Sequence, residues 1–226
     1  MIDPPRSSGD IAARYIRKLI FERDLGPGDR VPQDEIAHAL GISRIPVREA
    51  LIALERDGWV TIELHRGAFV NELDAAAVRD HYTLFGLVYG FAVRRALERD
   101  AGTGALADQL DVLLGRLGDR ADARSMADAA IGFHLAVIDV AHSPRIQTLM
   151  EAMSGLIPGN FFAVVPGAIE VGREGLAAVA EAVRADDADA AVEAWETMMH
   201  RQGELVVALF EQRGFFSDAE PSRPRR

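Results

Sequence analysis

The chain has 226 residues, carries a formal net charge of −10 and contains no cysteine. The length suggests one large or two small domains, and the lack of cysteine excludes disulfide frameworks and cysteine-based zinc sites. The first ten residues lack the apolar core of a signal peptide, and no apolar run approaches the ~18 residues of a membrane span, so we expect a cytoplasmic protein without a membrane segment.

Two segments near the start of the chain have helical spacing. In DIAARYIRKLIFERDL the apolar residues recur every three or four positions, and GPGD ends the segment. Its expected inner face consists of Ile11, Ala12, Tyr15, Ile16, Leu19 and Ile20. QDEIAHAL predicts a second, shorter helix. Its expected inner side consists of Ile36, Ala39 and Leu40.

A third helix is predicted directly after the tight turn 41–43. Ser43 can cap this helix, and Pro46 falls in its first turn, where a missing N–H group costs little. Its inner stripe has the spacing i, i+3, i+4, i+7 and consists of Val47, Ala50, Leu51 and Leu54. The β-rich runs WVTIEL and GAFVNEL, joined at HRG, predict a two-stranded hairpin. Three helices followed by a hairpin indicate a winged helix-turn-helix.

Two arginines at the start of the third helix point to DNA. Arg44 and Arg48 are four residues apart and share a helix face that the apolar stripe does not occupy. In helix-turn-helix proteins this part of the helix enters the major groove, where arginine bonds to guanine or to a phosphate. Residues 1–72 carry ten Lys/Arg against twelve Asp/Glu, so a local positive patch can exist there despite the acidic chain.

Other residues of the same region can assist, and a simpler interpretation stays open. Ser43 can offer a hydroxyl or a helix N-terminal N–H group to a phosphate. The hairpin tip, residues 65–67, combines an imidazole, a cation and a flexible glycine, which suits phosphates or the minor groove. The alternative is that the two arginines only pair with acids such as Glu49 or Glu55.

The region resembles a known family. LGISRIPVREALIALERDGWV followed by HRGAFV closely resembles the DNA-binding domain of the GntR family of bacterial transcription regulators, and IRKLIFERDLGPGDRVPQDEIAHAL resembles the first half of that domain. The resemblance implies that the DNA contacts are Ser43, Arg44, Arg48, His65, Arg66 and Gly67. One departure is Asp34, because fatty-acid-responsive members place an arginine there that touches DNA. We therefore expect fewer phosphate contacts on that side, or a different operator.

Beyond the hairpin the pattern is helical only. Helices are predicted over Asp74–Arg99, Gly104–Leu117, Asp122–Ala141, Arg145–Leu156, Glu170–Ala185 and Ala188–Arg213. The fold class is therefore mainly α, with an N-terminal winged helix-turn-helix over residues 9–72 and a C-terminal antiparallel all-α bundle over residues 74–213. The basic tail 214–226 is predicted to be disordered. NFFAVVPG, residues 160–167, is interpreted as a flap over a pocket or as a plain buried loop.

The helical part resembles the effector-binding domain of the FadR branch of the same family, mainly through FHLAVIDVAHSPRIQTLM. Many such domains hold a divalent metal with an aspartate, a histidine four residues later and two further histidines. His134 matches the first histidine, but the aspartate position is Ala130 and the second histidine falls on Leu176. The third falls at Met198 or His200. We therefore expect no metal and no other cofactor, because the remaining imidazoles make a weak site.

The apolar run LFGLVYGF favours a different kind of pocket. Its two glycines, Gly86 and Gly90, make room either for a closely packed helix or for a ligand. If a ligand binds, an apolar, acyl or aromatic compound fits this helix better than a small dicarboxylate. The predicted effector pocket consists of Phe85, Tyr89, His134 and His200.

Together these features predict a ligand-responsive, sequence-specific DNA-binding regulator of transcription, and not an enzyme. We expect a repressor that a small metabolite releases from double-stranded DNA, acting as a homodimer on an inverted-repeat operator. Two alternatives stay open. One is a constitutive DNA-binding dimer without an effector. The other is a helical metal-dependent enzyme, for which the sequence offers no nucleophile–base pair, phosphate loop or complete ligand set.

Overall fold

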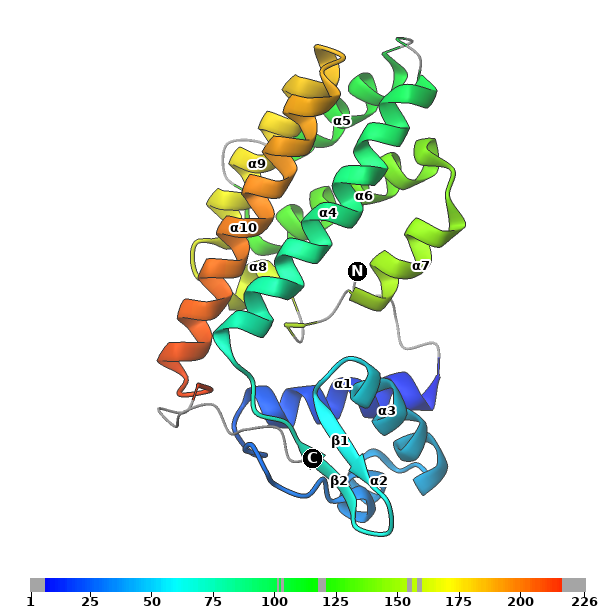
Figure 1. The fold of residues 1–226 in the computed structure, drawn as a ribbon, viewed down its shortest axis with the longest axis vertical. Helices are drawn as coiled ribbons and strands as arrows, with labels where there is room; N and C mark the ends of the chain where they lie inside the picture. The colour runs from blue at the N-terminus through cyan, green and yellow to red at the C-terminus, as the bar shows by residue number, and fades with distance from the viewer. Residues whose placement is uncertain are drawn as a thin grey trace.

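The computed structural model describes residues 7–100, 102, 104–117, 121–153, 156–157 and 160–216 (Figure 1). Its elements are α1 (Ser8–Phe21), α2 (Gln33–Leu40), α3 (Arg44–Arg56), β1 (Val60–Glu63), β2 (Gly67–Val70), α4 (Ala75–Asp100), α5 (Ala105–Leu117), α6 (Ala123–Ala141), α7 (Pro144–Met153), α8 (Phe161–Val164), α9 (Ala168–Arg184) and α10 (Ala188–Gln212). The predicted mainly α class is confirmed: three helices and a hairpin are followed by helices alone. The tail 214–226 was predicted to be disordered, which is wrong at its start, because Phe215 is 3% exposed and stacks on Phe210. Residues 217–226 lie outside the described residues.

The winged unit is held by a small apolar core between α1 and α3. The predicted inner stripe of α3 is confirmed, since its four side chains are at most 3% exposed. The inner face of α1 is narrower than predicted: Ile11 is 38% exposed, because it lies well away from the helix side on which Ile16 and Ile20 are buried. In α2 the predicted inner residue Ala39 is exposed and Ala37 is buried instead. The side of α2 that faces the core includes Ile36 and Ala37, and Ala39 lies outside it.

The hairpin is fastened to the rest of the winged unit on both sides. β1 and β2 pair antiparallel, with Val60 opposite Val70. On one side, the backbone N–H of Val31 donates to the carbonyl of Ala68 at 2.8 Å. On the other, the backbone N–H of Ile62 donates to the carboxylate of Glu55 in α3 at 2.7 Å. The orientation of the wing is therefore fixed relative to α3.

The helical unit is built around α4 and α10, which lie side by side along most of their length (Figure 1). Gly86 and Gly90 allow this close approach. A Cβ atom added at Gly86 would lie 3.7 Å from the Cα of Glu196, and one added at Gly90 would lie 3.1 Å from Cγ1 of Val192. The close-packing interpretation of these glycines is therefore the one that the structure supports. Among the described helices, none combines the length and the apolarity that a bilayer crossing needs.

The segment 160–167 contains a short helix that the sequence analysis did not predict. Asn160 caps α8: its side-chain oxygen accepts a hydrogen bond from the N–H of Phe162 at 3.1 Å, and its Nδ2 donates to the carbonyl of Ala123 at 2.9 Å. Four helical residues are too few to produce a periodic apolar pattern. These bonds attach the segment to the start of α6.

Candidate nucleic-acid interface and ligand site

Arg44 and Arg48 are exposed beside the buried stripe of α3, at the end of the helix nearest to the turn from α2. Arg44 is the first residue of the helix and forms an ion pair with Asp34 of α2. In the part of the chain that the structure describes, Arg48 forms no ion pair, Arg44 pairs with Asp34, and the carboxylate of Glu55 accepts a hydrogen bond from Ile62. The alternative interpretation, in which the two arginines pair with Glu49 or Glu55, does not agree with the structure.

Ser43 occupies the position directly before α3, as predicted. It is the N-cap residue, with φ −77° and ψ 170°, but its side chain makes no capping hydrogen bond within the described residues. Its side chain is exposed. The hydroxyl is thus available to an external acceptor or donor, and the first N–H groups of a helix lack partners within the helix.

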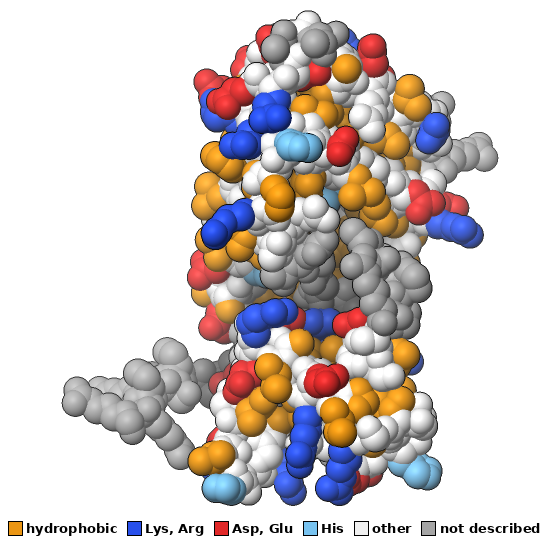
Figure 2. All heavy atoms as spheres, turned by 90° about the vertical axis from the view of Figure 1, so that its right-hand side faces the viewer, with side chains coloured by type: hydrophobic (Ala, Val, Ile, Leu, Met, Phe, Trp, Pro, Cys, Tyr) orange, Lys and Arg blue, Asp and Glu red, His pale blue; other side chains and the backbone are white. Residues whose placement is uncertain are grey.

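The wing tip places three of the predicted contacts at the end of the hairpin. His65 has φ 61° and Gly67 has φ 116°, a left-handed pair of conformations that turns the chain sharply. The guanidinium of Arg66 pairs with Glu63 and lies 5.4 Å from the centroid of the Phe69 ring. Leu64, which the sequence analysis did not single out, is 82% exposed at the same tip. Figure 2 shows Lys/Arg side chains gathered at this lower end of the molecule, with a histidine on either side.

In the helical unit, three of the four predicted pocket residues come together and the fourth does not. The ring of Tyr89 stacks on His134 with centroids 4.9 Å apart, and Phe85 stacks on the other side of His134 at 6.3 Å. The ring of Trp195 in α10 stacks on Tyr89, with centroids 3.8 Å apart, and completes a column of four aromatic rings. His200 is exposed on α10 and takes no part in the column. Side chains point in all directions around a long helix, so the position of His200 in the sequence did not show on which side of α10 it lies.

The column is an aromatic core rather than the walls of a cavity. Tyr89 is fully buried, its hydroxyl donates to the carbonyl of Phe133 at 3.0 Å, and burial raises its pKa. Burial also lowers the pKa of the His134 imidazole to about 4. His134 is therefore neutral at pH 7 and offers one hydrogen-bond donor and one acceptor.

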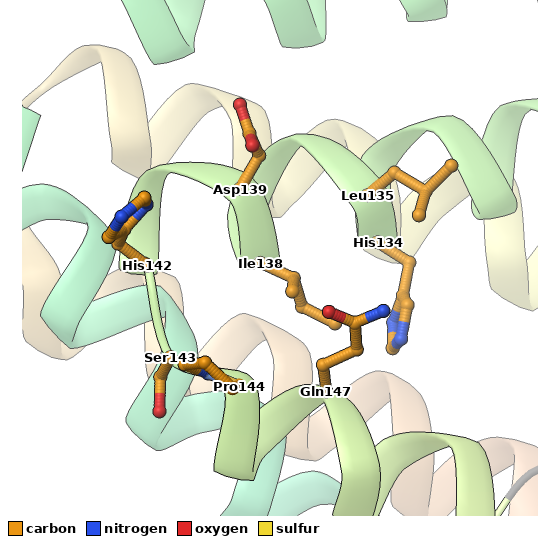
Figure 3. A pocket seen from close by; sticks show the side chains of 8 residues that line it. All are labelled: His134, Leu135, Ile138, Asp139, His142, Ser143, Pro144 and Gln147. Carbon is orange, nitrogen blue, oxygen red and sulfur yellow. The ribbon is translucent and has the colours of Figure 1, made fainter.

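A hollow of about 320 Å³ lies next to His134, between the end of α6 and the start of α7 (Figure 3). It is lined by His134, Leu135, Ile138, Asp139, His142, Ser143, Pro144 and Gln147. Figure 3 shows the amide of Gln147 and the ring of His134 pointing toward one another. The sequence analysis missed most of this lining. The only signal was the HSP break at residues 142–144, where α6 ends and α7 begins.

The metal site of the FadR branch does not fit these residues. Ala130 has no ligand atom, Leu176 is 1% exposed in an apolar setting, and Met198 is 3% exposed. Within the described ranges no three His, Cys, Asp or Glu side chains gather in a way that could hold a metal ion. His134 is the one imidazole of the pattern that lies in the bundle interior, and a single imidazole does not make a zinc or nickel site.

A winged helix-turn-helix with exposed arginines at the start of its third helix, followed by an all-helical unit, defines a DNA-binding regulator. Residues 9–70 match the gntR family of bacterial regulatory proteins, and residues 80–201 match the FCD domain. The chain belongs to the GntR family of transcriptional regulators, in the branch that carries an FCD effector-binding domain.

Individual proteins agree with this assignment. An HTH-type transcriptional regulator of Mycobacterium tuberculosis is 37% identical over 153 residues, which are 68% of this chain and 62% of that protein. The HTH-type transcriptional repressor RspR of Escherichia coli is 30% identical over 97 residues, 43% of this chain and 39% of its own. The aligned part thus spans less than two thirds of these relatives.

Two solved structures share the fold. Escherichia coli McbR/YncC superimposes with a TM-score of 0.60 at 19% identity, covering 92% of this chain and 99% of its own. A GntR family regulator from Pseudomonas syringae pv. tomato does so with a TM-score of 0.54 at 22% identity, covering 94% and 90%. At these identities the likeness concerns the fold alone.

Proposed function

We propose that the protein is a ligand-responsive repressor that reads an inverted-repeat operator as a homodimer and leaves it when a small metabolite binds. The observation that carries the proposal is the exposed pair Arg44 and Arg48 on one face at the start of α3. Ser43, directly before α3, and the wing tip, residues 65–67, are the other proposed contacts. We propose a site of action in the cytoplasm, on chromosomal DNA, and no enzymatic activity.

The DNA-reading part is tested by selecting preferred sequences from a library of randomised duplexes. Arg44→Ala and Arg48→Ala should each weaken binding to the selected duplex by about 1–3 kcal/mol, because each removes a contact to a base edge or to a phosphate. Arg66→Ala at the wing should weaken binding more evenly across sequences. Arg56→Ala is the control, since that arginine is exposed at the other end of α3. Unchanged binding by either α3 variant would remove that arginine from the site.

A stripe of exposed apolar side chains on α4 supports the homodimer. Leu84, Leu87 and Phe91 have the spacing i, i+3, i+7 and are 53%, 53% and 57% exposed. A second copy that covers this stripe would bring the two winged units together on one operator. Light scattering should give a dimer, and Leu87→Asp should dissociate it. A wild-type monomer at micromolar concentration that binds a single half-site contradicts the proposal.

The hollow beside His134 supports an effector site in the helical unit. Its volume of about 320 Å³ is at the small end of the range for ligand pockets. Apolar Leu135 and Ile138 next to neutral His134 favour an aromatic or acyl compound with one polar group. A thermal-shift screen of such compounds should find one that raises the melting temperature. Leu135→Trp, which narrows the hollow, should abolish that shift, and a screen without any hit favours the constitutive dimer.

A further inference from the structure

Asp34 and Arg44 meet across the turn between α2 and α3. They are ten positions apart in the sequence. Gly41 ends α2 in a left-handed conformation with φ 64°, and this turn brings the first turn of α2 beside the first residue of α3. A carboxylate oxygen of Asp34 contacts Nε of the Arg44 guanidinium. An aspartate thus lies against one of the two arginines proposed to read DNA.

The pair contributes little to the stability of the fold, but it restricts the orientation of the Arg44 guanidinium. Its side chains are 60% and 64% exposed, and exposed ion pairs stabilise a fold only slightly. A free arginine on a surface samples many rotamers, whereas a guanidinium held at Nε has a fixed plane and keeps its terminal NH2 groups as donors. Those are the donors that a guanine edge accepts in a bidentate contact.

Arg48 provides the contrast on the same helix face. It is exposed like Arg44, but within the described part of the chain no carboxylate holds it. A freely moving arginine can follow a phosphate or several bases, while a fixed one suits a single base edge. The two arginines of α3 therefore differ in how far their orientation is determined before DNA arrives.

We propose that Asp34 is a positioning residue that fixes Arg44 for one base pair of each half-site, so that it determines specificity rather than affinity. The inference rests on the proposed DNA-reading function. The carboxylate also adds a negative charge next to the phosphates, which weakens sequence-independent binding. Asp34 thus lowers binding to random DNA while sharpening the choice of one base.

The test uses the full-length protein and the duplex selected by the wild type. Binding is measured for that duplex, for its single-position variants and for an unrelated duplex, over a range of salt concentrations. Asp34→Asn should lower discrimination at one position per half-site by about tenfold, the size of one bidentate contact. Binding to the unrelated duplex should tighten, and the salt dependence should steepen by about one phosphate contact.

Two further variants separate positioning from charge. Glu35→Gln removes a neighbouring carboxylate of α2 that is also exposed, so it should tighten binding to the unrelated duplex and keep the discrimination. Asp34→Glu should restore most of the discrimination. Circular dichroism and melting temperature confirm that each variant is folded.

Three results overturn the inference. The first is unchanged discrimination in Asp34→Asn. The second is that Asp34→Asn binds the selected duplex and all its variants more tightly by the same factor, which would mean that Asp34 only weakens binding by Arg44 and does not orient it. The third is a loss of discrimination in Glu35→Gln as large as in Asp34→Asn. A wild type without any sequence preference contradicts the proposed function itself, and this inference falls with it.

Discussion

The rings of Phe21, at the end of α1, and Phe210, near the end of α10, meet edge to face with centroids 6.0 Å apart. Phe215 stacks on Phe210 at 4.7 Å, and the guanidinium carbon of Arg213 lies 4.1 Å from the centroid of the Phe21 ring. All three phenyl rings are at most 5% exposed. The winged unit and the helical unit are therefore joined by a buried aromatic cluster in addition to the covalent connection at residues 71–74.

We predict that Phe215→Ala lowers the free energy of unfolding by about 3 kcal/mol, because it removes a buried ring from this cluster. Hydrogen exchange should become faster in the last turn of α1, which loses a neighbour, and stay unchanged in α9. Leu64→Ala at the exposed wing tip is the control and should change stability by less than about 0.5 kcal/mol. Unchanged exchange in α1 would mean that the cluster does not hold the two units together.

Replacing glycine by alanine should lower the free energy of unfolding at one position and raise it at another. A Cβ atom at Gly175 in α9 would lie 2.6 Å from Cβ of Met198, so Gly175→Ala should destabilise the protein by about 1–3 kcal/mol. Gly115 in α5 is exposed and has nothing within 4 Å of such an atom. Gly115→Ala should therefore stabilise by about 0.5–1 kcal/mol. Thermal or urea unfolding of both variants measures this, and a shared sign would contradict the packing of α9 on α10.

Periodicity predicted most elements because local signals reinforced it. The bounds of α2 agree with the structure because Pro32 precedes the helix and Gly41 ends it. The stripe of α3 was predicted correctly because four large or branched apolar residues define one face. Ala39 was placed wrongly because alanine is compatible with either side of a helix, and only the position of Ile36 against α3 decides which side is buried.

The candidate sites depended on contacts that no local pattern encodes. The stacking of Trp195 on Tyr89 requires the relative rotation of α4 and α10, and the pair of Asp34 with Arg44 requires the geometry of the turn between two helices. The hollow next to His134 arises where α6 and α7 diverge, and it is lined largely by residues of that junction. Residue types indicated the chemistry of these sites, whereas their partners came only from the tertiary packing.

The stability of the helical unit should decrease as the pH falls below neutrality. Burial lowers the pKa of His134 to about 4 from an ordinary value of 6.5, so the unfolded chain binds more protons than the folded one between these values. The stabilisation is complete above about pH 6.5 and is lost toward pH 4, with a total on the order of 3 kcal/mol. Burial also lowers the pKa of His81, which adds in the same direction.

His134→Phe keeps a ring in the column and removes its titration, so its stability should depend less on pH over this window. His200→Ala is the control, because that side chain is exposed on α10 and takes no part in the column. Urea unfolding at several pH values measures the difference between the two variants. Parallel curves for wild type and His134→Phe would mean that His134 is not the buried neutral imidazole described above.

The helical unit should hold no tightly bound metal, in contrast to many members of the FadR branch. The branch pattern places an aspartate where this chain has Ala130 and a histidine where it has Leu176, and Leu176 is 1% exposed. His134 stacks on Phe85 and Tyr89, and within the described residues no group of three His, Cys, Asp or Glu side chains could hold a metal ion. Elemental analysis of protein purified without chelator or histidine tag should give far less than one equivalent of zinc or nickel per chain, and chelator should leave the melting temperature unchanged. About one equivalent in the wild type, lost in His134→Ala and kept in His200→Ala, would show that ligands outside this pattern complete a site around His134.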